Sequence, residues 1–304
     1  MLTLLQGVLG GGIRAGTPIL YATLGEVIAE RAGVVNLGVE GAMLAGACAG
    51  FITTAHTGDP WVGVAAAAAA GGLAALIHAF MVVTLRANQI ASGLALMFLS
   101  LGVTSFVGRP YVAVKINAIP QFAVPGVAGV PVLGALLFNH DLLVYGAYLL
   151  APLIWVFLFT TKWGLALRAV GEREAVAFAS GLPTATIQYL AVVGGGVLAG
   201  VAGAHLSLAY ARSWVEGMSN GRGFIAVALV IFATWHPLRA VVGAVVFGAV
   251  VALQFQIQAR GVAISPYFLD MAPYLLTLLG LLLWGKTRRL AAPEGLKAVF
   301  EGVE

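Results

Sequence analysis

The stretch GEVIAERAGVVNLGVEGAMLAGACAG, residues 25–50, combines an apolar composition with charged side chains. Glu40 lies in a part that must enter the membrane, where a buried carboxylate costs a few kcal/mol unless it is paired or hydrated. Asn36 and Gly38 precede it, and glycine weakens a helix interior. A broken helix at membrane depth is tolerated only where it lines a cavity or is buried in protein. The stretch therefore predicts a discontinuous helix.

Two interpretations of this break are open from the residues alone. In the first, the discontinuous helix lies beside a transport path. In the second, Asn36 and Glu40 tie neighbouring helices together, with Arg14 as a candidate partner. The spacing of these residues favours neither interpretation over the other.

The composition of the whole chain places it in a membrane. Of 304 residues, 61% are hydrophobic and 9% are charged, whereas soluble domains carry about 25% charged residues. The mean hydropathy is +0.98. Forty glycines suit close helix packing in a bilayer. The net charge of +4 is small and most basic residues lie between apolar runs, so we expect no nucleic-acid partner.

The apolar runs predict an all-α integral membrane protein, a polytopic bundle of about 8–10 transmembrane helices. About 20 apolar residues span a bilayer as a helix. Residues 1–13 could instead lie in the interface, with the first true span beginning near Arg14. The candidate spans are residues 3–24, 33–54, 60–85, 88–108, 141–160, 185–210, 222–235, 238–257 and 271–285.

The basic residues predict the orientation of these spans. Ten of them fall on one side and five on the other, and the richer side is expected to be cytoplasmic. The C-terminus is then inside, and the Pro-rich break 109–140 faces outward. We expect one transmembrane domain, residues 1–290, and a short cytoplasmic tail, residues 291–304. The inner set is Arg31, Arg86, Lys162, Arg168, Arg173, Arg239, Lys286, Arg288, Arg289 and Lys297, and the outer set is Arg109, Lys115, Arg212, Arg222 and Arg260.

A second interrupted segment is SNGRGFIAVALVIFATWHP, residues 219–237. Its apolar part, 223–235, reaches only about 20 Å as a helix, short of a hydrocarbon core of about 30 Å. Like the first segment, it opens on an Asn–Gly element, at Asn220. Short, glycine-interrupted segments in matching positions of two halves point to the central site of a transporter. Residues 71–102 also resemble 241–280 in pattern, and the paired segments run in opposite directions in the predicted topology, which would be an inverted repeat.

The longest inner loop, KWGLALRAVGEREAVAFASGLPTATIQ at 162–188, is also the most charged. A short helix is expected over 175–180, since acidic residues favour a helix N-terminus and Gly181 and Pro183 end it. Such a helix suits the docking of a soluble motor. An ordinary solvated loop is the alternative, and composition alone favours it.

These segments resemble a known family. GEVIAERAGVVNLGVEGAMLAGA resembles the signature of ABC-importer permeases of the nucleoside and simple-sugar class, in the wider branched-chain amino acid/ribose permease family. GLALRAVGEREAVAFASGL resembles the ATPase-coupling segment of the same family, and TPILYATLGE and NQIASGLALMFLSLG fit around the first motif. The resemblance covers roughly residues 13–285. The chain is most similar to the shorter permease of the nucleoside importers.

The resemblance implies roles for individual residues. Arg173 and Glu174 stand where related sequences often have Asn–Pro, and Phe178 stands where a polar residue is expected, so the docking contacts differ in detail. A coupling role within the loop 162–184 is implied for Gly164, Arg168, Gly171, Glu172, Glu174 and Gly181. A substrate-pathway role is implied for Asn36, Gly38, Glu40 and Gly41, to which position adds Asn88, Gln89, Ser92 and Asn220.

The resemblance also implies an assembly in a bacterial or archaeal cytoplasmic membrane. A second, longer permease completes the pore, a cytoplasmic ABC ATPase drives it and an extracytoplasmic lipoprotein delivers substrate. Nucleosides are the expected substrates, and a simple sugar such as ribose is the alternative. An ion-driven secondary transporter is a less favoured reading, because it would want more buried ionisable residues. We expect no cofactor in this chain, with ATP and Mg used by the partner ATPase.

One motif suggests an enzyme. GLLLWGKT, residues 280–287, fits the phosphate-binding pattern G-x-x-x-x-G-K-[ST]. That loop needs a strand before it and a helix after it, whereas these residues continue an apolar helix. We therefore read it as a helix end and expect no ATPase activity in this chain. The five histidines are scattered and Cys48 is alone, so no metal site is expected.

Overall fold

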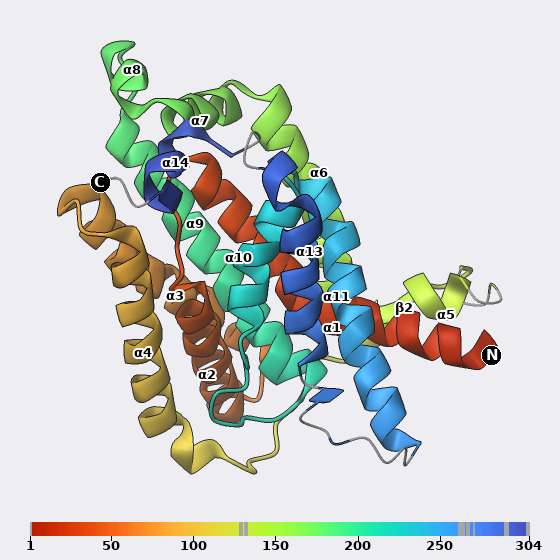
Figure 1. The fold of residues 1–304 in the computed structure, drawn as a ribbon. Helices are drawn as coiled ribbons and strands as arrows, with labels where there is room; N and C mark the ends of the chain where they lie inside the picture. The colour runs from red at the N-terminus through yellow and green to blue at the C-terminus, as the bar shows by residue number, and fades with distance from the viewer. Residues whose placement is uncertain are drawn as a thin grey trace.

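The structure is a computed structural model that describes residues 2–127, 130, 133–260, 265, 268–269, 271–288 and 292–301. Over these residues it is a helical bundle with one small hairpin (Figure 1). Arg289, a member of the inner basic set, and the tail residues 291 and 302–304 lie outside the described residues. The expected all-α fold is confirmed.

The first half of the chain forms four helices joined by short links. Asp59 begins the third helix by accepting a hydrogen bond of 2.8 Å from the backbone N–H of Trp61. Residues 2–13 continue into the rest of the first helix without a break. The elements are α1 (Leu2–Arg31), α2 (Val39–Thr57), α3 (Pro60–Ala79), the π-helix η1 (Phe80–Thr84) and α4 (Gln89–Gly108).

The expected outer loop 109–140 contains the hairpin. The 3-10 turn η2 (Arg109–Tyr111) leads into β1 (Gln121–Ala123), which pairs antiparallel with β2 (Asn139–Asp141); α5 (Leu133–Leu137) lies between the two strands. Asp141 then caps α6 (Leu142–Thr160) through hydrogen bonds of 3.1 and 3.2 Å to two backbone N–H groups.

The second half holds the predicted short helices. Phe232 ends an apolar helix of only 11 residues, as the length argument for residues 223–235 predicts. The elements are α7 (Lys162–Glu172), α8 (Glu174–Ala179), α9 (Thr184–Ala204) with the π-helix η3 (His205–Tyr210), α10 (Arg222–Phe232), α11 (Pro237–Ala259), α13 (Ala272–Arg288) and α14 (Glu294–Glu301).

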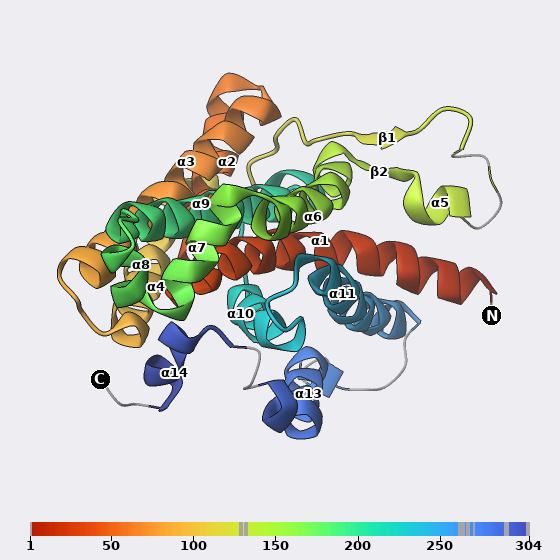
Figure 2. The ribbon, with the colours of Figure 1, turned by 90° about the horizontal axis from the view of Figure 1, so that it is seen from above.

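The packing pairs helices of the first half with helices of the second half, and the inverted repeat stays a prediction. Helix α1 packs along α11 of the second half, and α9 packs along α3 of the first. Gly25 lies against Gly195, and Gln188 donates to the carbonyl of Ala32 at 3.5 Å, so α1 and α9 run antiparallel. Figure 2 shows α10, α11 and α13 together on one side of α1. The expected pairing of residues 25–50 with 219–237 thus corresponds to α2 and α10.

Five of the described helical segments are long and apolar enough to cross a membrane, so the chain is a multi-pass membrane protein. Helix α4 exposes large apolar side chains, including Phe98 (64% exposed) and Phe106 (84%). Contiguous apolar surface of this kind marks contact with lipid or protein. The five segments are Pro60–Thr84, Gln89–Tyr111, Leu142–Thr160, Thr184–Tyr210 and Pro237–Ala259.

Candidate pathway and coupling site

The first helix break covers residues 32–38, between α1 and α2. Its backbone is held by side chains. Gln89 accepts a hydrogen bond of 2.8 Å from the N–H of Val35, and the ring of His78 contacts the Val35 carbonyl at 3.0 Å. Glu26 accepts a hydrogen bond of 2.6 Å from the N–H of Asn36. Because buried backbone groups need partners, these three side chains allow the helix to stop here.

Glu40 joins this break to the second one. Its carboxylate accepts hydrogen bonds from the Ser219 hydroxyl (2.6 Å) and from the N–H groups of Gly221 (2.8 Å) and Gly223 (2.6 Å). Helix α10 has no cap from its own Gly221, so Glu40 supplies the negative charge that a helix N-terminus favours. The geometry shows Glu40 tying α2 to α10. The suggested partner Arg14 is wrong.

The glycines predicted for the pathway allow helices to approach. A Cβ at Gly41 would lie 2.8 Å from the Cα of Met97 in α4, and one at Gly38 would lie 2.9 Å from a methyl of Leu96. Real Cβ atoms do not make such contacts, so α4 requires glycine at both positions. The structure thereby places Gly38 and Gly41 against α4.

The polar residues at the start of α4 face the same region. Asn88 caps the helix by accepting 2.9 Å from the N–H of Ala91. Ser92 contacts His78 at 3.1 Å, which links α4 to α3. Gln89 thus contacts the break directly, and Ser92 is linked to it through His78. The substrate-pathway role of Asn88, Gln89 and Ser92 stays a prediction. His78 and Glu26 also hold the break, and sequence reasoning did not place them in the site.

Asn220 marks the second break. It adopts a left-handed backbone conformation (φ 46°), and its carbonyl accepts a hydrogen bond of 2.9 Å from the hydroxyl of Tyr274 in α13. A cavity of about 70 Å³ opens beside it, with Ile19 and Gln254 among its lining residues. Asn220 therefore lies where α1, α10, α11 and α13 meet.

The other end of α10 is tied to α1. The indole N–H of Trp235 donates to Glu30 at 2.5 Å, and Arg31 donates to the Trp235 carbonyl at 3.2 Å. Trp235 is 2% exposed and Trp214 is 1% exposed. Both tryptophans therefore fill the interior of the bundle.

The coupling segment folds back onto the membrane helices. Thr161 caps the start of α7 by accepting a hydrogen bond of 3.0 Å from the N–H of Gly164. A Cβ at Gly164 would overlap the carbonyl of Phe157. The guanidinium of Arg168 lies 5.0 Å from the centre of the Phe159 ring, and that of Arg31 lies 5.6 Å from it. Two cations beside one aromatic ring hold α7 against α6 and the end of α1.

Gly171 brings α7 into contact with the first break. A Cβ at this position would overlap the carbonyl of Arg31 and lie 3.0 Å from the backbone N of Gly33. A Cβ at Gly295 of α14 would in turn lie 2.7 Å from the carbonyl of Gly171. Only glycine allows these three backbones to meet, so the coupling segment touches the break without an intervening side chain.

The remaining coupling residues lie at the junction and end of α8. Glu172 accepts 3.1 Å from the N–H of Glu294, and Glu174 accepts two hydrogen bonds from Arg86. Gly181 ends the segment in a left-handed conformation (φ 84°). The expected short helix is confirmed as α8. Sequence reasoning did not connect Arg86 or Glu294 to this segment.

The coupling segment presents apolar surface at this end of the bundle. Trp163 is 75% exposed, Val176 58% and Phe178 70%. A groove of about 550 Å³ runs between α7, α8 and Glu294, with Leu165 and Leu182 among its lining residues. Exposed apolar side chains beside charged ones are typical of a surface that another protein covers.

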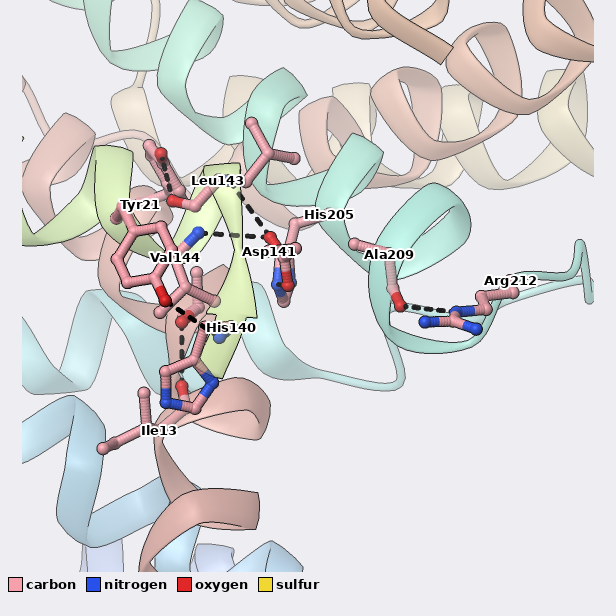
Figure 3. Close-up of polar contacts among 11 residues, drawn as sticks. Ile13, Tyr21, His140, Asp141, Leu143, Val144, His205, Ala209 and Arg212 are labelled. Carbon is pink, nitrogen blue, oxygen red and sulfur yellow. Dashed lines mark hydrogen bonds and ion pairs between the residues drawn. The ribbon is translucent and has the colours of Figure 1, made fainter. Parts of the chain in front are cut away.

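A separate buried polar cluster lies near the hairpin (Figure 3). The imidazole of His205 in η3 lies 3.4 Å from the carboxylate of Asp141, and both side chains are buried. Tyr21 of α1 donates 2.7 Å to the carbonyl of Leu143 in the same region. The cluster joins α1, α6 and η3. The buried histidines of the two π-extended helices thus differ, because His78 bridges α4 and the first break whereas His205 pairs with Asp141.

Comparison with known proteins supports the same interpretation of the two segments. The family described as "Branched-chain amino acid transport system / permease component" matches residues 8–283. The chain belongs to this family. It is a permease subunit of an ABC importer.

Three curated relatives cover most of the permease. It is 46% identical to the putative glucose ABC transporter permease protein TsgC13 of Haloferax volcanii, over 86% of this chain and 80% of the relative. It is 34% identical to the guanosine ABC transporter permease protein NupQ of Bacillus subtilis, over 87% of both. It is 32% identical to the nucleoside ABC transporter permease protein NupC of Lactococcus lactis, over 92% of both. No solved structure matches the chain significantly.

Proposed function

We propose that this permease forms one half of the pore of an ATP-driven importer of nucleosides, and that it receives its motion from a separate cytoplasmic ATPase. One contact carries the proposal: Gly171 of the coupling segment lies directly against Gly33 of the first helix break. A shift of α7 by one atom's width must therefore move the break or separate the two backbones. No flexible side chain absorbs the displacement.

The path from the motor to the pore runs through named contacts. Movement of α7 reaches residues 32–38, which continue into Glu40. Glu40 holds the N-terminus of α10 through the N–H groups of Gly221 and Gly223. The two broken helices would then move together between inward-facing and outward-facing states. Alternating access requires each state to be favoured in turn, and ATP binding and hydrolysis supply that difference.

A second permease is part of the proposal. The guanosine ABC transporter permease protein NupP, also of Bacillus subtilis, is 27% identical to this chain, over only 66% of its own length. One organism thus holds two such permeases, and the match covers less of NupP than of NupQ. This supports a hetero-dimeric pore with a longer partner. An extracytoplasmic binding lipoprotein would deliver the solute.

The proposed substrate class is based on the solutes named for the relatives. The names of NupQ and NupC specify guanosine and nucleoside, which supports a nucleoside. The 46% identity to TsgC13 supports a second candidate, glucose. Both solutes present hydroxyl groups on a sugar ring. Asn36, Asn88, Gln89, Ser92 and Asn220 are the proposed pathway residues, because amide and hydroxyl groups can bind such a ring without a charge.

The chain itself would not hydrolyse ATP. Residues 280–287, which fit the phosphate-loop pattern, belong to the continuous helix α13 (Ala272–Arg288). ATP and Mg would be bound by the partner ATPase. The end of the bundle that carries α7, α8 and α14 would face the cytoplasm, because the described members of the richer basic set lie at this end.

The first experiment is uptake of radiolabelled guanosine and glucose by cells that lack only this chain. Loss of ATP-dependent guanosine uptake that returns on re-expression would support the proposal. Loss of glucose uptake alone would retain the assignment as an importer permease and change the assigned substrate from a nucleoside to glucose. Uptake that depends on this chain but survives ATP depletion would overturn ATP coupling and favour an ion-driven transporter.

A further inference from the structure

The junction between α7 and α8 is held from two sides by adjacent residues. Arg173 is extended (φ −148°, ψ 95°) and separates the two helices. Its guanidinium donates to the carboxylate of Glu294 at 2.9 and 3.1 Å. The next residue, Glu174, accepts from Arg86 at 2.8 and 3.0 Å. Both pairs are bidentate, so each fixes direction as well as distance.

The first partner, Arg86, leads directly to the helix break. It lies in the link between η1 and α4 with a left-handed backbone (φ 55°). Three residues later, Gln89 accepts from the N–H of Val35 inside the break. A displacement of Glu174 is therefore passed through a short, strained link to the side chain that holds the break.

The second partner, Glu294, leads to the same place by another route. It begins α14, and its N–H donates to Glu172 at 3.1 Å. A Cβ at the following residue, Gly295, would lie 2.7 Å from the carbonyl oxygen of Gly171 and 3.9 Å from the Cα of Gly33. The C-terminal tail thus contacts both the coupling segment and the break.

A polar cavity separates the two routes. It measures about 190 Å³, and its lining includes Gly33, Arg86, Gln89, Glu174 and Gly295. The cavity leaves room for relative movement, and the ion pair between Arg86 and Glu174, both in its lining, is a direct link across it. Packed apolar side chains would leave no such room.

We propose that Arg86 and Glu294 are positioning residues that transmit movement of the α7–α8 junction to the break at residues 32–38, with the C-terminal helix α14 as a working part of the coupling apparatus. The proposal rests on the proposed function. The side chains of Arg86 and Arg173 are each 66% exposed. Exposed ion pairs contribute little to stability, so their loss should affect coupling and leave the fold intact.

The test is a charge swap in the complete importer, reconstituted in proteoliposomes with ATP. Tritiated guanosine and ¹⁴C-glucose serve as probes, and uptake and ATP hydrolysis are measured in the same vesicles. For Arg86→Glu and for Glu174→Arg we expect uptake per ATP hydrolysed to fall about tenfold, a usual size for coupling between sites. The double swap should restore the ratio. The pair Arg173→Glu with Glu294→Arg is tested in the same way.

A control variant and the amount of co-purified ATPase separate the outcomes. Lys115→Glu makes the same change of charge at an exposed position at the other end of the bundle, and its ratio should stay at the wild-type value. Unchanged ratios in the single variants would overturn the proposal. So would a double swap that fails to restore the ratio while the ATPase still co-purifies, because the residues would then act on the ATPase and not on each other. A wild-type complex without ATP-dependent uptake of either probe would overturn the proposed function, and the transmission role with it.

Discussion

The carboxylate of Glu40 in α2 accepts a hydrogen bond of 2.6 Å from the backbone N–H of Gly223 in α10. These residues are 183 positions apart in the chain, and each stands in the first turn of the helix that follows one of the two breaks. A residue of the first half of the chain therefore caps a helix of the second half. This contact makes the two breaks one mechanical unit.

Glu40→Gln should destabilise this unit. The amide removes the negative charge and turns an N–H₂ group toward backbone donors. Because hydrogen bonds to a charged group contribute about 2 kcal/mol each, the midpoint of thermal unfolding in detergent should fall by about 5 °C. Glu216→Gln, the same change at an exposed position in the preceding loop, is the control. Equal midpoints for the two variants would contradict a capping role for Glu40.

Gly171→Ala should uncouple transport. The new methyl group would overlap the carbonyl of Arg31, so α7 must move away from the break. We expect ATP-dependent uptake to fall about tenfold or more, as for other coupled sites. Gly194→Ala in α9 is the matched control, since a Cβ there meets no atom within 4 Å. Full uptake by Gly171→Ala would show that close backbone contact is not needed.

Glu172→Lys should abolish ATP-coupled uptake and leave the protein folded. Glu172 lies at the end of α7 and accepts a hydrogen bond from the backbone N–H of Glu294. A lysine cannot accept this bond and reverses the charge of the surface. Uptake in whole cells, with membrane insertion checked by surface labelling, measures the effect. Unchanged uptake would remove Glu172 from the coupling assignment.

Asp141 offers a test of the buried cluster near the hairpin. Asp141→Asn keeps a side-chain oxygen that can cap α6, because asparagine caps helices as well as aspartate does, but it removes the charge beside His205. Asp141→Ala removes the cap as well and should cost about 1 kcal/mol more. Thermal unfolding of both variants against wild type measures the two contributions. Identical midpoints for asparagine and alanine would show that the cap contributes nothing.

The Arg86–Glu174 pair should be insensitive to pH near neutrality. The hydrogen bonds from Arg86 lower the pKa of the Glu174 carboxyl below its usual value of 4.5. A carboxyl whose pKa is depressed stabilises the folded state above its unfolded pKa and loses that contribution as pH falls through the folded value. Titration of this pair should therefore not change the uptake per ATP hydrolysed between pH 8 and about pH 5. A Glu174→Gln variant, which lacks the titration, should show the same profile in this range. A wild-type profile that bends between these limits while the variant's does not would contradict the depressed pKa.

Much of the architecture could be predicted from the sequence because each membrane helix is marked by the residues of its own segment. Runs of about 20 apolar residues, the short run at 223–235 and the Asn–Gly elements at both breaks follow from the cost of exposing polar groups to lipid. The bounds of α6, of α9 together with η3, and of α11 lie within two residues of the predicted spans 141–160, 185–210 and 238–257. The short helix α8 and its end at Gly181 follow from local backbone preferences in the same way.

The partners of the buried polar groups were decided by the tertiary structure alone. The sequence places Glu40 in the membrane and requires a partner for it, but only the packing of α2 against α10 selects the N–H groups of residues 221 and 223 over Arg14. The link from Arg86 to Glu174 and the contact of Gly295 with Gly171 join segments that no local pattern relates. Local composition determines which segments are helices and which are broken, since that energy depends on neighbours in the chain. Which break meets which helix depends on contacts between residues far apart, and only the folded bundle determines them.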